Sequence, residues 1–80
     1  MKTVYVFLPN VERVQSFVET LELLDGDFEL LFEDYIIEAK SIMGILSLDL
    51  SKPVKLKIFN DSEQNLKAVT PFLAPEGDEL

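Results

Sequence analysis

The feature that most constrains the fold is the repeated change in hydrophobic spacing along the chain. Apolar residues recur at every second position in some segments, the period of a strand, and at every third or fourth position in others, the period of a helix. This spacing predicts strands over 3–8, 28–32, 35–39 and 54–59, separated by helices that begin near residues 11, 42 and 63. The order β-α-β-β-α-β-α contains two β-α-β crossovers around a hairpin. It predicts an α+β fold, with an antiparallel sheet and the helices on one face.

Residues that favour caps and turns lie between these segments. Asn10 can cap the first helix, and the run Asp25-Gly26-Asp27 is expected to end it, with Gly26 in a left-handed conformation. Glu33-Asp34 is the expected hairpin turn. Pro71 lacks an N–H group, so the last helix should kink or stop near Thr70. The segment 74–80 is acidic and is expected to be a loose tail of a single domain, 1–80.

Composition excludes several kinds of function. The chain has no cysteine and no histidine, which removes thiolate metal sites, the commonest metal ligand and the commonest general base, so no metal or cofactor is expected. The net charge is −8, which disfavours nucleic acid and anionic membranes as partners. No apolar run has the length of a spanning helix, and the start lacks the apolar core of a signal peptide. A cytoplasmic domain is expected.

The periodic positions also predict a core. Residues on one face of the first helix, on alternate positions of two strands and on the last helix should be buried together. These residues are Val14, Phe17, Val18, Leu21, Leu30, Leu56, Ile58 and Val69.

The stretch from Ala39 to Leu50 contains more large apolar residues than one buried helical stripe can use. Some of them must therefore lie at the surface or under a neighbouring element. Ser41 precedes this run and can cap the helix that it starts. An exposed apolar patch beside a capped helix is a candidate docking surface, although Ser41 could act only as a cap and the apolar residues only as core.

This stretch carries a resemblance to a known family. The run Lys40-Ser41-Ile42-Met43-Gly44-Ile45, followed by Ser47-Leu48, resembles the segment around the regulatory serine of HPr, the small phosphocarrier of the bacterial phosphoenolpyruvate-dependent sugar phosphotransferase system. From Phe17 to about Phe72 the chain follows the family pattern without a gap. The resemblance implies an HPr-like open-faced β-sandwich, with a four-stranded antiparallel sheet and three helices on one face.

The chain departs from the family before the first helix. The family carries phosphate on a histidine in a Pro-Asn-Gly-Leu-His-Thr/Ala-Arg-Pro-Ala loop. Here Pro9-Asn10 is followed directly by Val11-Glu12-Arg13, so the loop is shorter and its histidine is missing. By this resemblance Asn10 and Arg13 are the remains of a degenerate phosphocarrier loop, and no transfer of phosphate through it is expected.

The resemblance therefore implies a regulatory, protein-binding member of the family without the phosphocarrier histidine. In the family a bifunctional serine kinase/phosphorylase modifies the regulatory serine, and the product acts with a transcriptional regulator. By this resemblance Ser41 is the candidate phosphorylation site. The candidate partner-binding residues are Lys40, Ser41, Ile42, Met43, Ile45 and Ser47.

Two alternatives belong to other classes of function. Small α+β domains of this element order include acylphosphatases, which use an arginine and an asparagine, and Arg13 and Asn10 are present here. The chain shows no phosphate-binding glycine loop between strand and helix, so no catalytic residue is assigned. A small-molecule-sensing domain is the other alternative, but it would need a polar pocket that the sequence does not indicate.

Overall fold

The computed structural model describes residues 1–75, and the expected order of elements is confirmed. The acidic segment 76–80 lies outside the described residues. The strands are β1 (Lys2–Val6), β2 (Phe28–Phe32), β3 (Tyr35–Glu38) and β4 (Val54–Ile58). The helices are α1 (Val11–Glu22), α2 (Ile42–Leu46) and α3 (Glu63–Val69), followed by a 3₁₀ turn, η1 (Thr70–Phe72).

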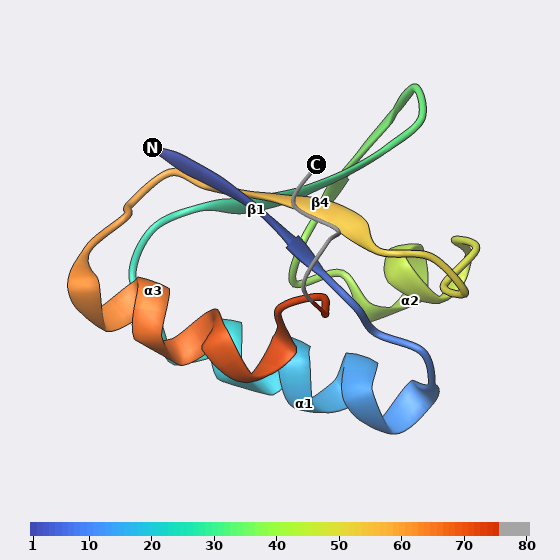
Figure 1. Cartoon of the computed structure of the whole chain (residues 1–80), viewed down its shortest axis with the longest axis horizontal. Coiled ribbons are helices and arrows are strands. Elements are labelled where there is room, and N and C mark those ends of the chain that lie inside the picture. Colours follow the sequence, from blue (N-terminus) through green and yellow to red (C-terminus); the bar gives the residue numbers. More distant parts are fainter. Residues whose placement is uncertain (76–80) are drawn as a thin grey trace.

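The four strands form one antiparallel sheet in the order β1-β4-β2-β3. The register aligns Val4, Leu56, Leu30 and Ile37 in one row across all four strands. These side chains share a face because residues directly opposite each other in a sheet point to the same side. α1 and α3 lie across this face and α2 lies at its end, whereas no helix of residues 1–75 covers the other face (Figure 1). The fold class predicted from the sequence is confirmed.

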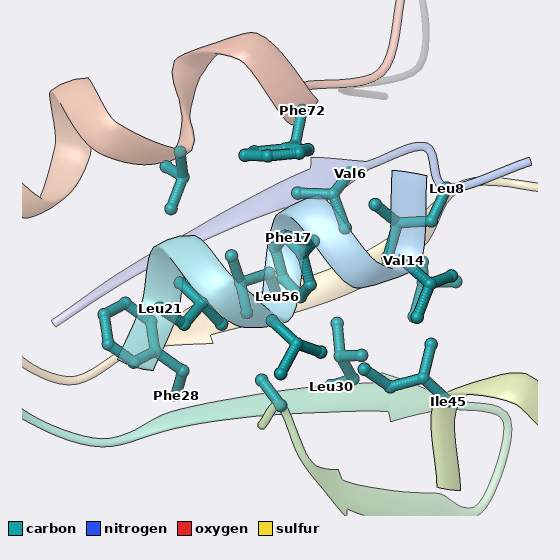
Figure 2. Packing of buried hydrophobic residues seen from close by; sticks show 14 of the residues in the cluster. Val6, Leu8, Val14, Phe17, Leu21, Phe28, Leu30, Ile45, Leu56 and Phe72 are labelled. Atoms are coloured by element: carbon teal, nitrogen blue, oxygen red, sulfur yellow. The ribbon is translucent and has the colours of Figure 1, made fainter. Parts of the chain in front are cut away.

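The core lies between the helices and the covered face of the sheet (Figure 2). All eight residues predicted to be core are buried. Phe17 of α1 meets Phe72 of η1 edge to face, with ring centroids 5.4 Å apart and planes at 76°. This geometry is the favoured one for two aromatic rings, and it fixes the C-terminal turn against the first helix.

α1 is shorter than the sequence suggests. It begins at the expected cap, where Asn10 Oδ1 accepts a hydrogen bond from the Arg13 N–H at 2.9 Å, but it ends at Glu22 with Leu23 as its cap. Gly26 therefore lies in the following loop rather than at the helix end. Its φ of +101° is one that L side chains rarely adopt, and an added Cβ would lie 2.7 Å from Asn60 Cβ. Gly26 is needed for a close approach of two loops.

The C-terminal segment is tied to the sheet further along than expected. α3 ends at Val69, two residues before Pro71, close to the stop predicted near Thr70. The Ala74 N–H then donates to the Tyr5 carbonyl at 2.9 Å, and Leu73 makes an isolated bridge to Val6. The prediction that the chain is loose from residue 74 is thus wrong at Ala74, because its backbone pairs with β1. Within residues 1–75 no helix has both the length and the apolar character needed to cross a membrane.

Candidate functional site

Ser41 caps α2, as expected from the sequence. Its backbone is extended, at φ −90° and ψ 95°, and its Oγ accepts a hydrogen bond from the Gly44 N–H at 3.3 Å. Its N–H donates to the Glu38 carbonyl at 3.0 Å, which holds the start of α2 against the end of β3. The side chain nevertheless remains exposed. The hydroxyl is therefore both a cap and a reachable group.

The polar neighbours of Ser41 are also positioned by the chain itself. The Lys40 N–H donates to Glu38 Oε1 at 3.0 Å, and Lys40 Nζ lies 6.0 Å from the centroid of the Phe28 ring. At the other end of α2, Ser47 Oγ donates to the Gly44 carbonyl at 2.6 Å. Ser47 thus serves as a C-terminal cap while its side chain stays exposed.

The apolar residues of α2 divide between core and surface. Met43 is 79% exposed, Leu46 is 39% exposed and Ile42 is partly exposed. Ile45 is completely buried, and Figure 2 places it near Val14 and Leu30, so its assignment as a contact residue for a partner is corrected. On a helix this short only one position can point fully at the core. We call the remaining residues the α2 surface; they are Lys40, Ser41, Ile42, Met43, Leu46 and Ser47.

Gly44 allows α2 to lie close to β3. A Cβ at this position would stand 3.0 Å from Ile37 Cγ2 and 3.1 Å from Ser41 Oγ. Both distances are shorter than ordinary van der Waals contacts. The absence of a side chain therefore permits the packing of the helix on the hairpin and the cap by Ser41 together.

A surface hollow of about 330 Å³ adjoins the α2 surface at the hairpin. Tyr35, Phe32 and Ile37 line it from the hairpin, and Ser47 and Leu48 line it from the end of α2. Tyr35 is 64% exposed. Sequence reasoning missed Leu46 and Tyr35 as surface residues, because their exposure depends on where α2 rests on the hairpin.

The loop after α2 is ordered by Asp49. Its Oδ1 accepts hydrogen bonds from Ser51 Oγ at 2.6 Å and from the Ser51 N–H at 3.1 Å. The two bonds hold the pKa of the Asp49 carboxyl below its ordinary value of 3.8, and the bond from the Ser51 hydroxyl has the larger effect. The charge of Lys52 lowers the pKa further.

Asn10 and Arg13, which the resemblance assigned to a degenerate phosphocarrier loop, make contacts at the ends of helices. Asn10 caps α1, and one Nη of Arg13 donates to the Pro71 carbonyl at 2.6 Å. The guanidinium carbon of Arg13 also lies 4.9 Å from the centroid of the Phe72 ring. Asn10 is therefore engaged in capping α1, and Arg13 joins α1 to η1. In residues 1–75 no group of three or more acidic side chains is arranged to hold a metal ion.

The element order, the sheet topology and the serine-capped α2 define the class of protein. It is an open-faced β-sandwich of the HPr-like type, with a mixed polar and apolar surface at its second helix.

The comparison with solved structures supports the same assignment. The chain is similar to HPr-C-His from Thermoanaerobacter tengcongensis, with 30% sequence identity, a TM-score of 0.71 and 89% of each chain covered. No protein-family model matches the chain. At this identity and coverage, the chain belongs to the HPr family. It does so without any histidine in its sequence.

Proposed function

We propose that this chain is a regulatory member of the HPr family that binds protein partners through the α2 surface and carries no phosphate on histidine. The observation that carries the proposal is the 79% exposure of Met43 beside an exposed Ser41. A polarizable, unbranched side chain such as methionine adapts to different apolar partners. The chain also lacks the imidazole that a phosphocarrier needs.

The proposal includes control by phosphorylation of Ser41. The hydroxyl is exposed and its hydrogen bond from the Gly44 N–H is long, at 3.3 Å. A phosphate there would add a charge of about −1.5 to −2 and three acceptor oxygens beside Lys40. The change would fall in the middle of the α2 surface, where it would alter the charge that a partner meets. By the family resemblance, the modifying enzyme would be a serine kinase/phosphorylase and the partner a transcriptional regulator.

The modification can be tested with that kinase/phosphorylase and ATP, followed by intact-mass measurement. We expect one phosphate on the natural chain and on Ser47→Ala, which loses the other exposed hydroxyl of the α2 surface, and none on Ser41→Ala. Incubation with the phosphoenolpyruvate-dependent enzyme of the phosphotransferase system should add no phosphate. Phosphate on Ser41→Ala would place the modified residue elsewhere, and an acid-labile, base-stable adduct from phosphoenolpyruvate would contradict the loss of the carrier role.

Docking can be tested separately by titrating the regulator and following amide NMR signals. Met43→Lys should abolish the shifts, because a cation desolvated at an apolar contact costs affinity. Leu23→Lys is the matched control, since Leu23 is 84% exposed at the far end of α1 from α2 (Figure 1). Equal binding by both variants would remove the α2 surface from the interaction.

The acylphosphatase alternative has less support. An arginine that binds a phosphoryl oxygen must be directed at the substrate, whereas the Arg13 guanidinium is held by the Pro71 carbonyl and the Phe72 ring. Asn10 is likewise engaged with the start of α1. The small-molecule-sensing alternative would need a polar pocket. The hollow beside Tyr35 is lined mainly by apolar side chains, and a second hollow of about 380 Å³, with Glu33, Lys52 and Lys55 in its lining, lies open to solvent.

A further inference from the structure

The two edges of the sheet differ in how much of their backbone is paired. Along β1, the C-terminal segment covers part of the edge, because the Phe7 N–H donates to the Phe72 carbonyl and the Ala74 N–H donates to the Tyr5 carbonyl. β3 forms the other edge and pairs only with β2 among the described strands. An open edge presents unpaired backbone groups that another chain can pair with.

The register shows which backbone groups of β3 face outward. The Ala39 N–H donates to the Phe28 carbonyl at 3.0 Å, so residue 39 faces β2. Backbone groups alternate along an antiparallel strand, so residues 35 and 37 also face β2, and Ile36 and Glu38 face away from it. The Glu38 carbonyl already accepts a hydrogen bond from the Ser41 N–H. The outward groups of β3 are therefore the N–H and carbonyl of Ile36 and the N–H of Glu38.

This edge lacks most of the features that protect edge strands. It contains no proline and no lysine, and the β2–β3 register is continuous without a bulge. Tyr35 and Ile36 are 64% and 66% exposed, so apolar side chains flank the free backbone groups on both faces of the strand. A segment that paired here would bury them.

The charge around the edge indicates the kind of partner. Glu29, Glu33, Asp34 and Glu38 lie on the hairpin, which has no lysine or arginine between residues 28 and 39. Within residues 1–75, the two ion pairs, Met1–Asp61 and Glu63–Lys67, involve none of these carboxylates. A basic segment would be attracted here, whereas a second copy of this chain, with its net charge of −8, would bring the same acids against them.

We propose that β3 accepts a short extended segment of another protein as a fifth strand, and that this segment alternates apolar residues with Lys or Arg. β3 has four residues, so the segment would pair over about the same length. Its apolar side chains would lie beside Tyr35 and Ile37. Its cations would lie on the open face, beside Glu38, which is opposite Glu29 in the register. This interaction is independent of the α2 surface and of Ser41.

The test uses a labelled Val-Lys-Val-Lys-Val-Lys peptide with blocked ends, and a Val-Glu-Val-Glu-Val-Glu peptide as its control. We expect saturable binding of the basic peptide alone, weakened by salt. Amide hydrogen exchange should slow at Ile36 and Glu38, and should not change on the edge of β1. Binding without slower exchange at these two amides would overturn the proposal, because it would show attraction by charge without strand pairing.

A pair of variants separates the backbone from the side chain. Ile36→Pro removes the outward N–H at an edge position where proline is tolerated, and Ile36→Thr keeps it with a β-branched side chain. Because one hydrogen bond is lost, the proline variant should bind the peptide with about tenfold lower affinity than the threonine variant. Equal affinities would refute strand addition. If Ile36→Pro does not fold, the exchange measurement on the natural chain decides.

Self-association is the remaining outcome. Light scattering should show a monomer at the concentrations used for binding. A dimer that Ile36→Pro dissociates would identify a second copy as the occupant of the edge and would contradict the proposal of a basic partner.

Discussion

Truncation of two neighbouring apolar residues of α2 tests how this helix divides between core and surface. Ile45 is completely buried, and removal of a buried isoleucine to alanine costs about 2–5 kcal/mol through lost transfer energy and an unfilled cavity. Met43 is 79% exposed, so about a fifth of its surface is lost from water. If full burial of methionine contributes about 1.5–3 kcal/mol, Met43→Ala should cost only about 0.3–0.6 kcal/mol.

The assay is urea unfolding followed by circular dichroism. A domain of this size has a stability of about 4–12 kcal/mol, so Ile45→Ala could leave the protein partly unfolded. Ile45→Val is the gentler companion, with an expected loss of about 0.5–1.5 kcal/mol. The denaturant slope should stay constant across the variants, since the surface exposed on unfolding hardly changes.

The assignment of Ile45 to the core and Met43 to the surface fails if Met43→Ala costs more stability than Ile45→Ala. A loss above about 1.5 kcal/mol for Met43→Ala would mean that Met43 packs as core, and the α2 surface would lose its main apolar contact. A loss below about 0.5 kcal/mol for Ile45→Ala would mean that the helix is rotated from the orientation described.

Three further predictions concern the hairpin, α2 and the loop after it. Glu33 has a positive φ of 54°, which asparagine adopts more readily, so Glu33→Asn should raise the unfolding free energy by up to about 1 kcal/mol. An unchanged Tm in thermal unfolding would refute strain at this turn. Gly44→Ala should lower the unfolding free energy by about 1 kcal/mol, because the new methyl group crowds Ile37 and the Ser41 cap. If the methyl group met no crowding, alanine would instead raise the unfolding free energy by about as much, since it favours a helix more than glycine does, and that result would contradict the prediction. Ser51→Ala should return the Asp49 pKa toward 3.8 in an NMR titration, because both hydrogen bonds to the carboxylate come from Ser51 and the hydroxyl makes the larger contribution. Because the pKa of Asp49 is lower in the folded state, this carboxylate stabilises the fold above its ordinary pKa, and the contribution is lost as pH falls through the folded pKa. An unchanged Asp49 titration in Ser51→Ala would contradict the assignment of these hydrogen bonds.

Local spacing in the sequence was sufficient for the order of elements, the eight core positions and the caps at Asn10 and Ser41. Each of these depends on residues a few positions apart, whose relative placement follows from the period of a helix or a strand. The excess of apolar residues between Ala39 and Leu50 also indicated that some had to be exposed, and the exposure of Met43 agrees with it.

Tertiary contacts decided what local spacing could not. Ile45 and Met43 lie two positions apart on one short helix, and only the rotation of α2 on the hairpin, permitted by Gly44, makes one core and the other surface. Arg13 became a structural residue because η1, far along the chain, brings the Pro71 carbonyl to it. The open edge of β3 likewise follows from the strand order, which no single segment encodes, since a pairing between distant strands depends on how the whole core packs.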